Sequence, residues 1–445
     1  MTFAAARHGV PDYAMAHRQP AGDRGRAAAD NGPVTGLTAD PPFLDVADPA
    51  FSLRSAAVRR ARETGWYART SYGLAVLRYD QVSRLIRHPD LRQGSLAWPA
   101  HHGITSGPFA DWWAGWVLNK EGEDHQRLRR LLNPAFSRRL VDAVAPRFLA
   151  LATELIDAFA AAGRCEFMAE FAEPYAARVI AILLGIPEGE WRLLAADSAT
   201  VGLAMGVRIR ADLPRIEAAL ANLFGYADAL IAARRRSPRD DFVTRLVEAQ
   251  AGAERLTTKE LRDSLVLLIF GGFDTTRNQL GLAMQAFMDS PGQWRLLAER
   301  VDLGPAAVEE VMRVSPTTTW VTREALRDFT FDGLDISAGT TIHLYCASAG
   351  TDPLAVPDGD IDITATGRPP HFAFGGGHIH YCLGHLVARA DMSAALPLLA
   401  RRLREPQVSG EAIWLPHSGN TGPARLPIAF TEGQERCRSE SSGQA

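Results

Sequence analysis

The sequence has few cysteines, no long apolar run and no marked excess of charge of one sign. Its cysteines are far apart, and no two of them have the CxxC spacing; they are Cys165, Cys346, Cys382 and Cys437. This distribution argues against a disulfide framework and against an iron–sulfur cluster. The formal net charge of −3 gives no sign of a nucleic-acid-binding protein.

Apolar segments are short throughout. The longest, at 179–186 and 265–269, are far too short to span a bilayer, and no apolar signal-peptide core lies near Met1. We therefore expect a soluble, cytoplasmic protein without a membrane partner.

The composition suits one large folded unit. Hydrophobic residues make up 47% of the chain, and no linker interrupts its interior. Residues 1–40 show no sustained periodicity. We expect a flexible N-terminal extension over 1–40, a single domain over 41–430 and a flexible tail over 431–445.

Local patterns predict mainly helices with a few short strands. Helices are predicted at 53–64 and 80–88, and two strands at 66–67 and 74–77. Most of 144–248 has the spacing of amphipathic helices.

Residues 94–115 are rich in glycine, proline and histidine and predict a long loop without secondary structure. Such loops are usually functional or disordered, and Trp98, Trp112 and Trp113 argue against disorder. The tryptophans either recognise an aromatic ligand or pack beneath the loop.

The segment 371–391 surrounds Cys382 and reads HFAFGGGHIHYCLGHLVARAD. A helix is predicted from Leu383, so Cys382 lies at a helix N-terminus, where backbone N–H groups and positive charge favour a thiolate. The glycines at 375–377 let the backbone pass close to a flat group. A cysteine thiolate in this setting is suited to bind haem iron.

Two other interpretations of this segment stay open. Cys382 could be a buried cysteine without a function. It could also share a zinc site with the nearby histidines, which are His371, His378, His380 and His385.

A long helix is predicted from a capping box formed by Thr257 and Glu260. The pattern continues to Asp289, about 32 residues or roughly 48 Å. Its centre, FGGFDTTRNQL, contains poor helix formers inside an apolar helix, which indicates either a function or a kinked core helix. Thr275 can bond a carbonyl or a ligand, and Asp274 can relay protons.

The stretch around Cys382 resembles the haem-thiolate loop of the cytochrome P-450 superfamily, Phe-Gly-x-Gly-x-His-x-Cys-x-Gly. Phe374, Gly375, His380, Cys382 and Gly384 match, although one extra residue lies within 375–378. The resemblance implies that Cys382 is the axial ligand of haem b and that the other four residues help to form the haem site.

The centre of the long helix resembles the I helix of the same family. This resemblance implies that Gly271 and Gly272 lie against the haem. It also implies that Thr275 takes part in protonating dioxygen, with Asp274 as the proton supply.

Other matches concern charged pairs. His125 and Arg129, four residues apart, resemble the His-x-x-x-Arg motif that binds the haem propionates, and Arg323 stands where the family has another propionate-binding arginine. Glu310 and Arg313 resemble the structural Glu-x-x-Arg motif.

The resemblance covers about 51–430 and implies a mainly α fold with a small β region, in which a helical domain surrounds the haem. It places 94–115 over the substrate. The expected pocket residues are Trp98, Phe270, Thr318, Thr319, Asn420 and Thr421.

The implied function is that of a bacterial, soluble haem-thiolate monooxygenase. It would activate dioxygen to hydroxylate a small organic substrate, such as an aromatic secondary metabolite. One alternative is oxidative C–C or C–N coupling of an aromatic, tryptophan-derived or cyclic-peptide substrate. Another is a non-catalytic haem-binding protein. Electrons would come from NAD(P)H through a ferredoxin and its reductase. The ferredoxin would be attracted by Arg129, Arg130 and Arg389. The protein would act as a monomer.

Overall fold

The computed structural model describes residues 40–48, 51–250 and 256–433. Its α-helices are α1 Ala56–Thr64, α2 Tyr79–Leu85, α3 Trp98–His101, α4 Pro108–Gly115, α5 Gly122–Leu132, α6 Arg138–Asp157, α7 Glu173–Leu184, α8 Trp191–Gly202, α9 Ile209–Arg236, α10 Phe242–Glu248, α11 Thr258–Met288, α12 Pro291–Glu299, α13 Gly304–Val314, α14 Cys346–Gly350 and α15 His385–Arg402.

The strands are short. They are β1 Phe43–Leu44, β2 Tyr67–Thr70, β3 Gly73–Val76, β4 Leu91–Gln93, β5 Arg164–Glu166, β6 Trp320–Ala325, β7 Phe329–Phe331, β8 Leu334–Ile336, β9 Thr341–Tyr345, β10 Leu403–Val408, β11 Ile413–Trp414, β12 Pro423–Arg425 and β13 Pro427–Glu432.

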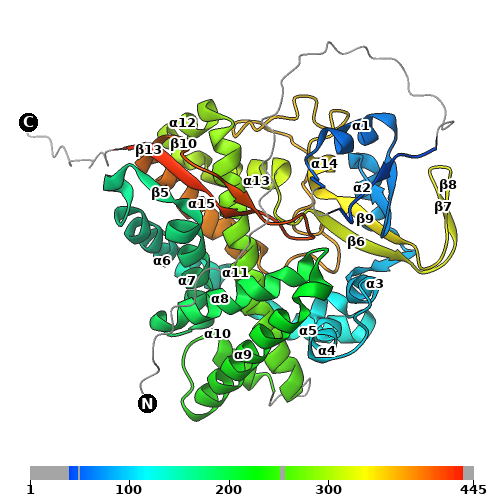
Figure 1. Ribbon diagram of the computed structural model, residues 1–445. Coiled ribbons are helices and arrows are strands. Elements are labelled where there is room, and N and C mark those ends of the chain that lie inside the picture. The colour runs from blue at the N-terminus through cyan, green and yellow to red at the C-terminus, as the bar shows by residue number, and fades with distance from the viewer. Residues whose placement is uncertain (1–39, 49–50, 251–255, 434–445) are drawn as a thin grey trace, which may run out of the picture.

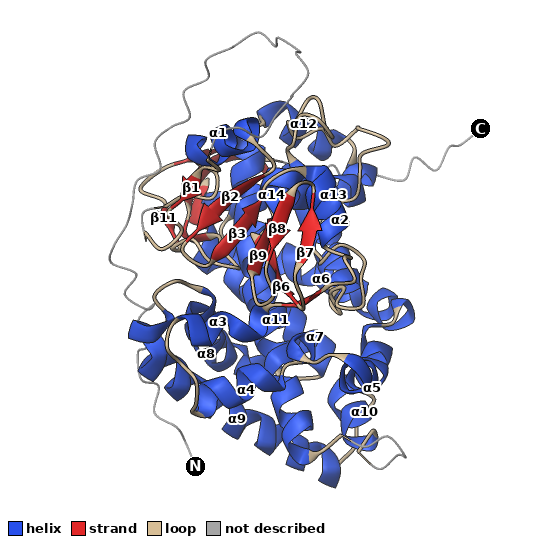
Figure 2. Ribbon diagram, turned by 90° about the vertical axis from the view of Figure 1, so that its right-hand side faces the viewer, coloured by secondary structure: helices blue, strands red, loops and turns tan. Residues whose placement is uncertain are grey.

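The main sheet lies away from several of the helices of the middle of the chain. The main sheet has the order β1-β2-β3-β9-β6-β4 and lies with α1 and α2 toward one end of the molecule, while α4, α8 and α9 lie at the other (Figure 2). Three smaller sheets complete the β region. This arrangement confirms the predicted fold class.

The β2–β3 hairpin requires a glycine at its turn. Gly73 has φ +121°, and a Cβ there would lie 2.1 Å from the carbonyl oxygen of Thr341. This close approach lets β3 pair in parallel with β9, with Leu74 opposite Ile342. The hairpin predicted from the N-terminal pattern thereby joins a strand from far along the chain.

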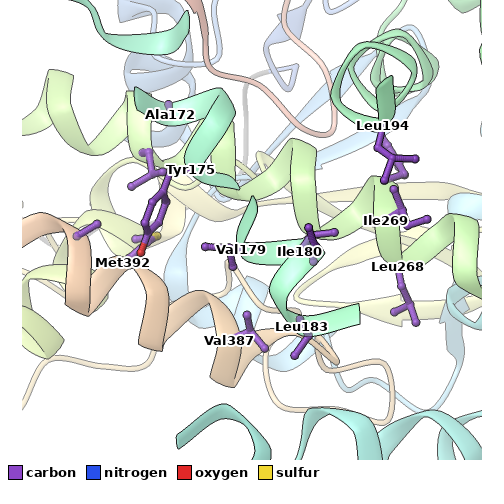
Figure 3. Close-up of a cluster of buried hydrophobic side chains, with 14 of the residues drawn as sticks. Ala172, Tyr175, Val179, Ile180, Leu183, Leu194, Leu268, Ile269, Val387 and Met392 are labelled. Carbon is purple, nitrogen blue, oxygen red and sulfur yellow. The ribbon is translucent and has the colours of Figure 1, made fainter. Parts of the chain in front are cut away.

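Helix α11 runs through the middle of the fold (Figure 1). Its N-terminus has the predicted capping box, in which the Thr257 side chain accepts from the Glu260 N–H and Glu260 accepts from the Thr257 N–H. The helix spans 31 residues and ends at Met288, with Asp289, the predicted end of the pattern, as its C-cap. Apolar side chains of α7, α11 and α15 form the neighbouring core (Figure 3).

The prediction of an unstructured loop at 94–115 is wrong, because the structure has α3 and α4 there. Pro108 begins α4 directly after Gly107, whose φ is +105°. Phe109, Trp112 and Trp113 then share one buried face at helical spacing. Packing of this aromatic face against the core stabilises the helix, although the local sequence favours a helix only weakly.

Three further differences concern boundaries and one long helix. The helix after Cys382 begins at His385, later than predicted, and β13 continues to Glu432, beyond the predicted boundary at 430. The expectation of flexibility over 1–39 and 434–445 falls outside the described residues.

In the described part of the chain, α9 is long and apolar enough to cross a membrane by length and composition. In this fold α9 packs against α8 and α11.

Candidate functional site

Two adjoining cavities of about 270 and 300 Å³ meet at Cys382. Both are also lined by Gly271 and Thr275 of α11 and by Phe374 and His380 of the cysteine segment. The tertiary structure therefore joins the two segments that the sequence analysis singled out.

Three consecutive glycines shape the backbone before Cys382. Gly375, Gly376 and Gly377 have φ values of +89°, +72° and +74°, a region that other residues rarely adopt. A Cβ on Gly376 would lie 2.4 Å from Ile86. The Cys382 N–H donates to the Phe374 carbonyl at 3.0 Å. The glycine run absorbs the extra residue, and the bond between Phe374 and Cys382 holds the ends of the segment together.

Cys382 is exposed, and it lines both cavities. The surrounding protein raises the pKa of its thiol by desolvation, while the backbone N–H groups of Gly384 and His385 and the charges of Arg129 and Arg389 lower it. The N–H groups at the helix end therefore favour the thiolate in the predicted direction, but desolvation has the larger effect. A coordinated metal cation reverses that balance, since it deprotonates a bound thiol.

The histidines near Cys382 have protein partners of their own. His371 lies 3.3 Å from Glu309, and His385 accepts from Arg389 at 3.0 Å. Over 40–48, 51–250 and 256–433, no group of three or more His, Cys, Asp or Glu side chains is placed to hold a metal ion. The zinc alternative therefore has no ligand set in this part of the chain.

Two arginines beside the cavities have no carboxylate partner in the described residues. Arg129 of α5 is half-buried at the first cavity, where burial lowers its pKa and the Cys382 charge raises it. Arg323 of β6 is 3% exposed and donates only to neutral acceptors, the Ile86 and Thr322 carbonyls and the Gln93 amide. Burial lowers the pKa of Arg323 to about 10. Buried cations of this kind are matched to anionic groups on a ligand, such as the carboxylates of haem.

Two histidines lie close together beside these arginines. The rings of His125 and His380 are 4.3 Å apart, and the Nδ1 atoms of both are buried without a hydrogen-bond partner. Burial, together with the charges of His380 and Arg129, lowers the pKa of His125 to about 4. His380 Nε2 lies 3.2 Å from Glu121. These ring nitrogens, which have no partner in the described residues, can form hydrogen bonds with a bound carboxylate.

Sequence analysis missed two members of this cluster. Glu121 at the N-cap of α5 accepts from the Gln93 N–H at 3.0 Å, and the Gln93 side chain accepts from Arg323 at 2.6 Å. Neither Glu121 nor Gln93 belongs to a recognisable sequence motif. Only the fold brings the end of β4, the start of α5 and β6 together.

The glycines at the centre of α11 face different surroundings. A Cβ on Gly271 would meet nothing within 4 Å, whereas one on Gly272 would lie 2.1 Å from Ile180 of α7. Gly271 therefore leaves room at the cavity, and Gly272 permits close packing of two helices. Thr275 donates to the Gly271 carbonyl at 2.6 Å.

Asp274 does not line either cavity at Cys382. It lines a third cavity of about 300 Å³, together with polar residues of α9 and the C-terminal segment. Its carboxylate accepts from Arg277 at 3.1 Å and from the Asn420 amide. Burial raises the pKa of Asp274. Asp274 and Thr275 are adjacent in sequence, but they face different cavities.

The expected pocket residues divide into two groups. Trp98, Phe270, Thr318 and Asn420 line a cavity at Cys382, as do Trp113 and Trp116, which the sequence analysis did not include in the pocket. Thr319 and Thr421 line neither cavity and form hydrogen bonds within the protein instead. The Thr319 hydroxyl donates to the Ser418 carbonyl, and the Thr421 N–H donates to the Thr317 carbonyl.

The basic patch expected to attract a redox partner is smaller than predicted. Arg389 pairs with Glu309 at 2.6 Å, and Arg129 is half-buried at the cavity. Arg130 alone of the three is exposed.

Comparison with known proteins agrees with this site. No protein-family model matches the chain. Luteothin monooxygenase of Streptomyces thioluteus is 37% identical over 395 residues, which cover 88% of this chain and 97% of that protein. A polyketide biosynthesis cytochrome P450 of Bacillus subtilis is 30% identical over 321 residues, covering 71% of this chain and 78% of that one.

The fold is shared with a solved cytochrome P450 of Chondromyces apiculatus. That structure superposes with a TM-score of 0.77 at 28% identity, covering 88% of this chain and 100% of that one. The chain belongs to the cytochrome P450 family, whose cofactor is a haem with a thiolate ligand. It is an oxidoreductase of the monooxygenase type, as predicted, and hydroxylation is favoured over the coupling and non-catalytic alternatives.

Proposed function

We propose that this monooxygenase holds haem through Cys382 and uses Thr275 to control the protons that dioxygen activation requires. The observation that carries the proposal is the position of Cys382 where two cavities meet, with Gly271 and Thr275 lining both. The lining is mostly apolar, so a bound substrate and cofactor would be shielded from water.

When bound, haem supplies the binding and reductive activation of dioxygen. Arg129, Arg323, His125 and His380 would hold its carboxylates through charge-assisted hydrogen bonds. The absence of a side chain at Gly271 leaves space for the flat ring.

Thr275 is suited to hold a proton at the site of oxidation. Its hydroxyl now donates to the Gly271 carbonyl, and rotation about one bond would turn the donor into the cavity. A hydroxyl is both donor and acceptor. It can therefore stabilise a proton on one oxygen atom of dioxygen while it receives another from the protein interior. We assign the supply of that second proton to Asp274.

The electrons would come from NAD(P)H through a ferredoxin and a ferredoxin reductase in the cytoplasm, with the protein acting as a monomer. Family membership supports this assignment, and exposed Arg130 supports it weakly. For the substrate, the aromatic wall formed by Trp98, Trp113, Trp116 and Phe270 favours an apolar, ring-containing molecule. We therefore assign a small organic substrate, a secondary metabolite, and the similarity to luteothin monooxygenase supports this assignment.

The decisive variant is Cys382→Ser. The reduced carbon monoxide complex of the parent should show the strongly red-shifted Soret band of a thiolate ligand, and the variant should lose this band entirely. The matched control is Cys165→Ala, because Cys165 is buried away from both cavities. If Cys382→Ser retains the band, Cys382 is not the ligand.

A further inference from the structure

Asn420 lies on the boundary between the site at Cys382 and a second cavity. It lines the 300 Å³ cavity that contains Cys382 and also the separate 300 Å³ cavity that contains Asp274. The Asp274 cavity, called here the polar cavity, is the more polar of the two and includes Arg208, Asp212 and Arg215. The contact between Asp274 and Asn420 therefore stands between the polar cavity and the cavity that Thr275 lines.

The side chain of Asn420 is held firmly in this position. Its amide N–H donates to the Asp274 carboxylate, and its carbonyl oxygen accepts from the Thr317 hydroxyl at 2.5 Å. Its backbone N–H donates to the Ser418 hydroxyl at 3.2 Å. Asn420 is 6% exposed and Asp274 is 3% exposed. The hydrogen bond between these two buried side chains holds the carboxylate on the side of the polar cavity.

We propose that Asn420 is a positioning residue for proton delivery, acting as a charge-sensitive latch on Asp274. The proposal rests on the role assigned above to Asp274. A bond to an ionised carboxylate is roughly twice as strong as a bond to a neutral group. Asn420 therefore holds Asp274 while it is ionised and releases it more easily once it is protonated.

The proton balance is simple. The Asp274 carboxylate takes up one solvent proton through the polar cavity and becomes neutral. It turns toward the cavity that Thr275 lines and passes that proton to the Thr275 hydroxyl, which gives its own proton to the oxygen atom being protonated. The side chain of Asp274 then returns to Asn420 as a carboxylate. The Asn420 amide loses and gains no proton. Arg277 bonds the other carboxylate oxygen at 3.1 Å and favours the return of the charged form.

The first test measures the protonation of Asp274 directly and needs no turnover. The carboxyl stretching band of protonated Asp274 can be identified by infrared difference against Asp274→Asn and followed with pH. The Asn420→Ala variant loses a donor to the charged form, so the pKa of Asp274 should rise by about one unit, a tenfold change in proton affinity. Thr317→Val keeps that donor and should give a smaller rise. An unchanged pKa in Asn420→Ala would overturn the latch.

The second test is a double-mutant cycle on the rate of NADPH oxidation with a surrogate ferredoxin and reductase. Asn420→Ala alone should slow proton-limited turnover about tenfold while haem content is retained. In an Asp274→Asn background, the same change should have little further effect. If the effects of Asn420→Ala and Asp274→Asn on the rate are additive, Asn420 does not act through Asp274 and has only a structural role. If no variant or parent oxidises NADPH, the proposed function fails, and the infrared titration still decides the role of Asn420.

Discussion

Arg313 and Arg323 are both buried arginines, and they differ in what surrounds the guanidinium group. Arg313 of α13 donates to both oxygens of Glu310, at 2.8 and 2.7 Å, and to the carbonyl of Gly350 at 2.7 Å. Arg323 of β6 donates only to neutral oxygens, and burial lowers its pKa to about 10.

The difference separates a structural arginine from a binding arginine. Arg313 has its counter-ion within the same helix, three residues away, so its charge is compensated by the fold itself. Arg323 forms no ion pair with a carboxylate in the described part of the chain, although the charge of Glu121 acts on it from a distance and partly opposes the effect of burial on its pKa. A buried cation is costly without an anion, so Arg323 indicates a ligand with negative groups. Both residues came from motif matches, but only the contacts explain why their roles differ.

The largest effect should come from breaking the compensated pair. Arg313→Ala leaves the buried Glu310 carboxylate with only the longer contact to Arg368, at 3.7 Å, and breaking a buried pair costs about 3–5 kcal/mol. Urea denaturation should show this loss in the free energy of unfolding whether or not haem is bound. Arg84→Ala, at an exposed pair with Asp332, serves as the control and should change stability by less than about 1 kcal/mol. A loss of similar size in both variants would contradict the comparison.

Arg323 should instead affect cofactor retention. Each charge-assisted hydrogen bond contributes about 1.5–3 kcal/mol, so Arg323→Ala and Arg129→Ala should each lose haem roughly tenfold to a hundredfold faster. The double variant should purify mainly without haem. Transfer of haem to an excess of apomyoglobin measures the rate, with Arg84→Ala again as the control. Unchanged haem retention in the double variant would mean that these arginines do not bind the propionates.

The smallest effect should be confined to coupling. Thr275→Ala removes a hydroxyl that contacts only the Gly271 carbonyl in the protein, so haem and substrate binding should persist. The second proton then reaches the wrong oxygen atom and hydrogen peroxide is released. A tenfold fall in product per NADPH corresponds to about 1.4 kcal/mol. Peroxide and product should be measured per NADPH consumed, once a substrate is found. Equally tight coupling in the variant would remove Thr275 from proton control.

Local sequence signals gave good predictions where neighbouring residues decide the structure. The capping box of Thr257 and Glu260 and the pairing of Glu310 with Arg313 depend on residues three apart, and both are present as predicted. The loop predicted at 94–115 failed for the opposite reason. Its helix α4 is stabilised by aromatic side chains that pack against distant parts of the chain, such as Trp112 against Phe270.

The sequence by itself determined the family and the mainly α fold and predicted Cys382 as the haem ligand, because these follow from short motifs and local periodicity. Only the tertiary structure decided which side chains share a cavity. Asp274 and Thr275 are consecutive, yet they face different cavities, since successive residues of a helix point about 100° apart. Asn420 reaches Asp274 from the other end of the chain. Contacts of this kind depend on how distant segments pack, and no local pattern records them.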